Sequence, residues 1–164
     1  LRKNNPNIEI FSIEESNKFE KYYFENNIKL LSKTFPIKND TNHKFDYIHL
    51  SHVMEHFLNL DDSINNLEKL INKNGIIFVE VPNCSKEYWI NDIHDEPHVL
   101  FFSKKSIKNI FNKDSFEIIK FETCGLTWGE YIENYYKKNK PTNSLNKIKN
   151  VINGIWLRLL LKKL

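Results

Sequence analysis

The twelve residues FDYIHLSHVMEH, at positions 45–56, contain the most informative change of character in the chain. Phe45 to Leu50 is rich in aromatic and β-branched residues, and this composition predicts a strand. His52 to His56 then places two imidazoles and one carboxylate within five positions. We therefore expect a buried strand that ends directly at a polar, chemically capable turn.

The bulk properties fit one globular domain in a reduced compartment. The 164 residues carry a net charge of +3, which is too small to indicate a nucleic-acid partner. No apolar run approaches the roughly 20 residues that cross a bilayer, and the two cysteines show no metal-binding spacing. We expect a cytoplasmic protein. Because the chain begins without methionine, in what reads as the end of a helix, we also expect a fragment of a longer protein.

Short apolar segments alternate with amphipathic ones along the chain. This alternation is typical of a doubly wound α/β domain with a mostly parallel sheet. In such sheets ligands bind beyond the carboxyl ends of the strands, so the turn at 51–56 is a candidate site. The expected strands are 8–13, 28–32, 45–50, 76–81 and 116–122, and the expected helices are 16–26, 61–71, 103–111, 130–138 and 145–163.

Three stretches carry a resemblance to a known family: FDYIHLSHVMEHFLNLDD at 45–62, LEKLINKNGIIFVEVPN at 67–83 and EPHVLFFSKKSIKNIFNKDSFEIIKFETCG at 96–125. In order and spacing they resemble the fourth strand and its His-x-x-Glu-His turn, the fifth strand, and the late His-x-x-x-Phe-Ser segment of class I S-adenosylmethionine-dependent methyltransferases. The similarity is greatest to the branch that acts on small molecules, sugars and quinones. The resemblance implies a Rossmann-like sheet and S-adenosylmethionine as the cofactor.

The sequence departs from this family at its cofactor loop. The family's glycine-rich loop follows its first strand, yet no Gly-x-Gly occurs here and the first glycine is Gly75. We therefore expect the first strand and this loop to lie upstream of Leu1, and the sheet to show a gap where the family's central first strand lies. For the same reason we expect this chain alone to bind the cofactor weakly.

The resemblance implies cofactor contacts at the ends of three strands. Glu14 follows a strand, where an acidic residue accepts hydrogen bonds from ribose hydroxyls; the alternative is an ordinary turn acid. Phe35 is expected as an apolar wall for the adenine, or else as a core residue. Leu50, Ser51 and His52 are expected beside the sulfonium end of the cofactor.

Glu55 and His56 are the first candidates for chemistry on the methyl acceptor. Methyl transfer requires alignment and desolvation of the reactants, and a hydroxyl acceptor benefits from a general base, for which an imidazole with an ordinary pKa near 6.5 is suited. The alternative is that both residues brace the following helix.

His98 is expected to face the acceptor from the wall of the substrate pocket. Asp92, His94 and Asp95 lie close to it in sequence and raise the alternative of a metal site. Their spacing matches no recognised ligand pattern, so the sequence predicts no metal.

The end of the chain combines basic and apolar residues. We expect a partial methyltransferase domain over 1–140 and a basic amphipathic helix over 141–164, which would pack on the domain, bind a partner or lie on a membrane surface. The expected function is methyl transfer to a small-molecule acceptor, such as a sugar or glycan precursor. The alternatives are a non-catalytic binding or scaffold module, and a nicotinamide-dependent oxidoreductase, against which the His-x-x-Glu-His turn speaks.

Overall fold

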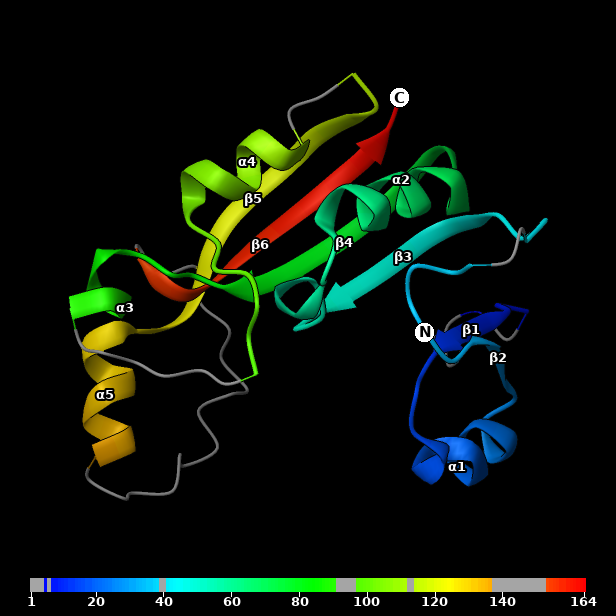
Figure 1. Ribbon diagram of the computed structural model, residues 1–164, viewed down its shortest axis with the longest axis horizontal. Coiled ribbons are helices and arrows are strands. Elements are labelled where there is room, and N and C mark those ends of the chain that lie inside the picture. Colours follow the sequence, from blue (N-terminus) through cyan, green and yellow to red (C-terminus); the bar gives the residue numbers. More distant parts are fainter. Residues whose placement is uncertain (1–4, 6, 39–40, 91–96, 112–113, 137–152) are drawn as a thin grey trace. The chain divides into compact units, whose positions relative to one another are not determined.

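A computed structural model describes residues 5, 7–38, 41–90, 97–111, 114–136 and 153–164. The chain divides into two units, Leu1–Asn42 and His43–Leu164, and each has its own internal contacts. Figure 1 shows the elements of both units.

The first unit is a strand–helix–strand segment. Strand β1 (Ile10–Ile13) pairs in parallel with β2 (Ile28–Ser32), and the short helices η1 (Asn17–Phe19) and α1 (Glu20–Glu25) connect them. The side chain of Ser16 accepts a hydrogen bond from the backbone N–H of Lys18 and so begins η1. This arrangement confirms the expected order of elements, although the helical segment contains two short helices.

The second unit contains a four-stranded sheet in the order β3-β4-β6-β5. Strands β3 (Phe45–Ser51) and β4 (Ile71–Pro82) are parallel, whereas β6 (Gly154–Lys163) is antiparallel to both β4 and β5 (Phe116–Thr127). Three of the four strands therefore run in the same direction. This confirms the expected Rossmann-like α/β class and adds one reversed strand.

Helices α2 (Leu60–Leu70) and α4 (Lys104–Phe111) lie over one face of this sheet (Figure 1). Alternate side chains are buried along most of β6 and in the middle of β4, which is the pattern of strands with one covered face. The carboxyl end of β4, from Val79 to Pro82, is buried on both faces. The core combines these strand residues with apolar side chains of both helices: Leu67, Leu70, Ile77, Val79, Ile107, Phe111, Leu157, Leu159 and Leu161. The remaining helices are η2 (Met54–His56), α3 (Lys86–Ile90) and α5 (Trp128–Tyr136).

The expected helix at the end of the chain is wrong where the structure describes it. Residues 154–163 form β6, which lies inside the sheet between β4 and β5. The leucine-rich run satisfies a helical pattern as well as a strand pattern, and pairing with two distant strands decides between them. Residues 154–163 therefore belong to the sheet of the second unit, and they do not supply the helical surface expected for membrane or partner contact. The rest of the expected helix, 141–152, lies outside the described residues.

The described strands form two separate sheets, one in each unit. Among the described strands, β1 is hydrogen-bonded to β2 and β3 to β4, and β1 and β3 belong to different sheets. Among the described helices, none is both long and apolar enough to cross a membrane.

Candidate functional site at the carboxyl end of β3

The chain turns sharply where β3 ends. His52 has a φ of 53°, in the left-handed region that side chains other than glycine rarely adopt. Its backbone N–H donates a hydrogen bond of 3.0 Å to the carbonyl oxygen of Glu80 on the neighbouring strand. This bond fixes the turn and directs the chain into η2, so Ser51 and His52 lie at the carboxyl end of β3 and Leu50 is buried just before them.

Glu55 lies at the centre of the candidate site and is fully buried. Its Oε1 lies 3.2 Å from Nδ1 of His52 and 3.9 Å from Nε2 of His98. Its backbone carbonyl accepts hydrogen bonds of 2.9 Å from the N–H groups of both Val99 and Leu100. These backbone bonds hold the segment that carries His98 against η2, across more than 40 residues of sequence.

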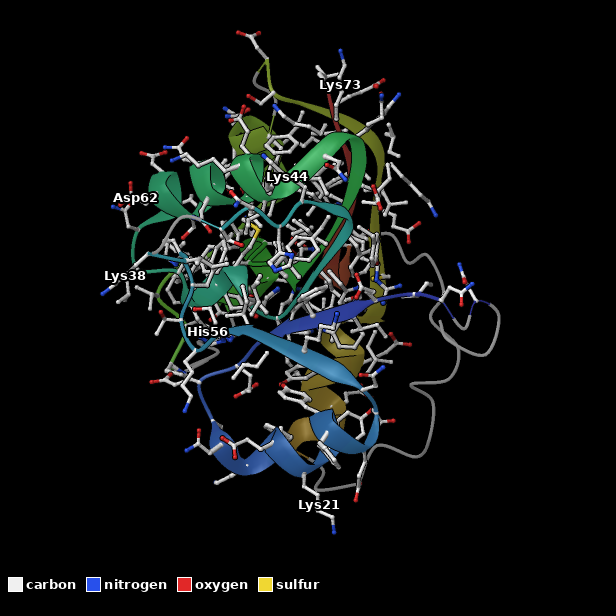
Figure 2. The ribbon with its side chains drawn as sticks, turned by 90° about the vertical axis from the view of Figure 1, so that its right-hand side faces the viewer. Lys21, Lys38, Lys44, His56, Asp62 and Lys73 are labelled. Atoms are coloured by element: carbon white, nitrogen blue, oxygen red, sulfur yellow. The ribbon has the colours of Figure 1, made fainter. Side chains whose placement is uncertain are left out.

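The three side chains that the sequence predicted for acceptor chemistry lie together. The rings of His56 and His98 are 5.0 Å apart, centroid to centroid, and meet at 62°. Glu55, His56 and His98 each offer one polar atom, and these atoms all lie within 4.8 Å of one another. Glu55 is buried, His98 is half-buried and His56 is exposed at the end of η2, where Figure 2 labels it. The cluster thus extends from the core to the surface.

A second carboxylate, which the sequence analysis missed, supports this turn. Glu80 on β4 is 7% exposed and accepts a hydrogen bond of 2.9 Å from the hydroxyl of Ser51. Its other oxygen accepts from Nε of Arg158, its cross-strand partner on β6. Nε2 of His52 lies 3.7 Å from the same carboxylate. The sequence did show an acidic residue, Glu80, inside its most hydrophobic expected strand. It gave no partner for this residue, because Arg158 lies in a segment that was expected to be a helix.

His52 therefore lies between two buried carboxylates. Its hydrogen bond to Glu55 raises its pKa above the usual value, and the charges of Glu55 and Glu80 add to this effect, whereas burial opposes it. The edge of the His52 ring also meets the Trp156 ring, with 5.7 Å between centroids. A protonated His52 offsets negative charge beneath the turn and holds the Glu55 carboxylate in place.

Glu14 and Phe35 belong to the first unit. Glu14 follows β1, is half-buried, and its backbone N–H donates to the carbonyl of Ser32 at 3.1 Å. Its Oε1 accepts a hydrogen bond of 2.9 Å from the N–H of Ser16, which fixes the carboxylate at the carboxyl end of the strand. An ionised carboxylate accepts about four hydrogen bonds, so Glu14 keeps acceptor capacity for hydroxyl donors such as those of a ribose. Phe35 is half-buried in the loop after β2. Asp92, His94 and Asp95 lie outside the described residues.

A mostly parallel sheet of this kind belongs to the Rossmann-like class of α/β proteins, in which ligands bind beyond the carboxyl ends of the strands. A family model described as a methyltransferase domain matches residues 1–120, so the chain belongs to this methyltransferase family. S-adenosylmethionine is the methyl donor of the family, and the expected enzyme class and cofactor are thereby confirmed.

Solved structures of low sequence identity share the fold. A methyltransferase from Thermotoga maritima, described as a possible histamine N-methyltransferase, is 15% identical with a TM-score of 0.61 over 93% of this chain and 72% of its own. TehB from Haemophilus influenzae is 15% identical with a TM-score of 0.61 over 96% of this chain, which spans about half (51%) of TehB. The N-methyltransferase NodS from Bradyrhizobium japonicum, in complex with S-adenosylhomocysteine, is 12% identical with a TM-score of 0.60, over 99% of this chain and 70% of NodS. A comparison with curated proteins gives no significant match.

Proposed function

We propose that the protein transfers the methyl group of S-adenosylmethionine to an oxygen of a small-molecule acceptor, such as a sugar or a glycan precursor. Family membership supplies the reaction class. The observation that carries the proposal is the cluster of Glu55, His56 and His98, which extends from a buried carboxylate to an exposed imidazole beyond the carboxyl end of β3.

The cofactor, when bound, supplies a methyl group on a sulfonium centre that is already reactive. The chain has to bind it, align the acceptor and exclude water. We assign the ribose hydroxyls to Glu14, because its carboxylate is held by the N–H of Ser16. We assign the adenine to Phe35 and the sulfonium end to the backbone of Leu50, Ser51 and His52, whose turn is fixed by the hydrogen bond to Glu80.

The acceptor end of the site is assigned to the exposed side of the cluster. A hydroxyl becomes a better nucleophile as it loses its proton, and the cluster offers two ways to promote this loss. An imidazole takes up the proton, or the side chains bind a cation that lowers the proton affinity of the oxygen. In the first case Glu55 is a positioning residue, because its carboxylate contacts His52 and lies 3.9 Å from His98. In the second case its carboxylate is one of the side chains that bind the cation.

An amine is the second candidate acceptor. NodS is named as an N-methyltransferase, and the protein from Thermotoga maritima is named as a possible histamine N-methyltransferase. Membership of a methyltransferase family supports an enzyme over the non-catalytic binding module.

The test follows formation of S-adenosylhomocysteine with panels of sugars, nucleotide sugars and small amines. The proposal expects turnover with a hydroxyl-bearing acceptor. His56→Ala is expected to lower kcat by about 10²-fold or more, as loss of a group that promotes proton transfer does, with an unchanged dissociation constant for S-adenosylhomocysteine. Equal losses of turnover and cofactor affinity would mark His56 as structural. Methylation of amines alone would overturn the proposed acceptor.

Glu14→Ala is expected to weaken cofactor binding, in contrast to His56→Ala, because it removes an acceptor for the ribose hydroxyls. Its matched control is Glu9→Ala, which removes an exposed carboxylate paired with Lys29 in the same unit. Calorimetry is expected to show weaker binding of S-adenosylhomocysteine for Glu14→Ala than for Glu9→Ala. Equal affinity of both variants would remove Glu14 from the site.

A further inference from the structure

We propose that Glu55, His56 and His98 bind a divalent transition-metal ion, and that this ion holds the oxygen of the methyl acceptor. The cation site depends only on these three side chains, whereas its role toward the acceptor rests on the proposed function. The sequence analysis raised a metal only for His98 with Asp92, His94 and Asp95, and predicted none because their spacing matches no recognised ligand pattern.

The donor set has the chemistry of a catalytic metal site. Two imidazoles and one carboxylate suit zinc and neighbouring divalent ions, and catalytic zinc sites use three protein ligands with an open fourth position. The three ligand atoms already lie within 4.8 Å of one another. Metal–ligand bonds of about 2.1 Å in tetrahedral geometry place ligand atoms about 3.4 Å apart. The exposed ring of His56 has the freedom to make a shift of this size.

The buried carboxylate gives a second, independent indication. Glu55 is fully buried, and its Oε2 has no hydrogen-bond partner among the described residues. A buried carboxylate is costly unless its oxygens are paired or bind a metal. A cation between Glu55, His56 and His98 supplies the missing partner at the point where the two imidazoles converge.

The surrounding residues resemble the outer shell of a metal site. Nδ1 of His52 lies 3.2 Å from Oε1 of Glu55, and His52 is in turn held by its backbone hydrogen bond to Glu80. Partners of this kind orient ligating carboxylates and tune their affinity for metal. The backbone bonds from Val99 and Leu100 to the carbonyl of Glu55 bring His98 into the same set.

The cation would have a defined chemical task. A metal-bound hydroxyl loses its proton far more readily than a free one, and the exposed side of His56 leaves the open position accessible from solvent. The acceptor oxygen gives its proton to water and forms a bond to the methyl carbon. The carbon–sulfur bond breaks, and its electron pair remains on sulfur. No oxidant or reductant is needed.

The test measures metal binding directly. The protein is titrated with Zn²⁺ by calorimetry and with Co²⁺ by visible absorption, beside His56→Ala, His98→Ala and Glu55→Gln. His43→Ala, which removes an exposed imidazole before β3, is the matched control. We expect the cluster variants to weaken Zn²⁺ binding by at least about tenfold, and His43→Ala to bind as the wild type does. Circular dichroism verifies folding, and the exposed position of His56 makes His56→Ala the safest variant.

The outcomes separate the metal site from the proposed function. Equal Zn²⁺ affinity of the wild type and all three cluster variants would overturn the site, even if methyl transfer is observed. Zn²⁺ binding that depends on the cluster supports the site, even if no acceptor is methylated. Where methyl transfer is measured, its loss on chelation and its return with the divalent ion support the role of the cation, and full activity after complete chelation would overturn that role.

Discussion

The ion pair between Glu80 and Arg158 gives a prediction about how the sheet supports the site. The side chains are 9% and 16% exposed, and Nε of Arg158 donates to Glu80 across neighbouring strands. Breaking a buried pair by removing one partner costs about 3–5 kcal/mol, because a charge stays buried without compensation. Glu80 also accepts a hydrogen bond from Ser51 and lies near His52. These two side chains still offset part of its buried charge when Arg158 is removed. We therefore expect Arg158→Met to destabilise the protein by about 3 kcal/mol, at the lower end of that range.

Equilibrium denaturation in urea, followed by circular dichroism, measures this cost. Removing both charges in Glu80→Gln/Arg158→Met is expected to recover about 1–2 kcal/mol relative to the sum of the single variants, since contacting residues are not additive. Lys120→Met is the matched control, because its amino group pairs with Glu122 but its side chain is 58% exposed; we expect a loss below about 1 kcal/mol. The reasoning would be refuted if Arg158→Met lost as little unfolding free energy as Lys120→Met. It would also be refuted if the losses of the two single variants added up to the loss of the double variant.

Two further predictions concern the ends of the sheet. Gly154→Ala presses a Cβ into the backbone carbonyl oxygen of Cys124 on β5 and is expected to cost about 3 kcal/mol or more. Gly129→Ala in α5 places a Cβ that meets nothing closer than 3.9 Å and is expected to stabilise the protein by about 0.5–1 kcal/mol. Thermal unfolding compares the two variants, and equal effects would contradict the packing described for β6. The hydrogen bond from Lys163, and to a smaller extent the one from Ser115, holds the pKa of the Glu68 carboxyl below its usual value. The stability that these bonds add to the folded protein is therefore fully present above the pKa of Glu68 in the unfolded state. It is lost as the pH falls through the pKa of Glu68 in the folded state. The urea midpoints of the wild type and Ser115→Ala are therefore expected to differ at pH 7 and to converge in acid, and a difference that is constant with pH would exclude this linkage.

Local signals predicted most of the elements around the site. The β-branched and aromatic run after Lys44 predicted β3 within one residue, and Ser103 correctly marked the start of α4, where its hydroxyl accepts from the N–H of Ser106. Glu55 and His56 were predicted for chemistry on the acceptor and His98 for the wall of the substrate pocket, and the structure brings the three together through the carbonyl of Glu55. These features depend on short-range chemistry or on the order of strands.

Long-range pairing explains what the sequence could not reveal. Leucine is a strong helix former, so nothing local in residues 154–163 separated a helix from a strand. Pairing with β4 and β5 makes β6 a strand, and the same pairing brings Arg158 to Glu80 across 78 residues of sequence. Because the segment around Arg158 was expected to be a helix, the sequence could not show that Arg158 pairs with the buried carboxylate of Glu80.

A crystal structure of the protein grown with S-adenosylhomocysteine tests the central claim, that the turn after β3 forms one end of the methyl-transfer site. The account predicts that the sulfur lies within about 4 Å of the Leu50–His52 backbone, at the contact distance of packed atoms, and that the ribose hydroxyls donate to Glu14. A cofactor bound away from this turn, with His56 and His98 remote from its sulfur, would contradict the account.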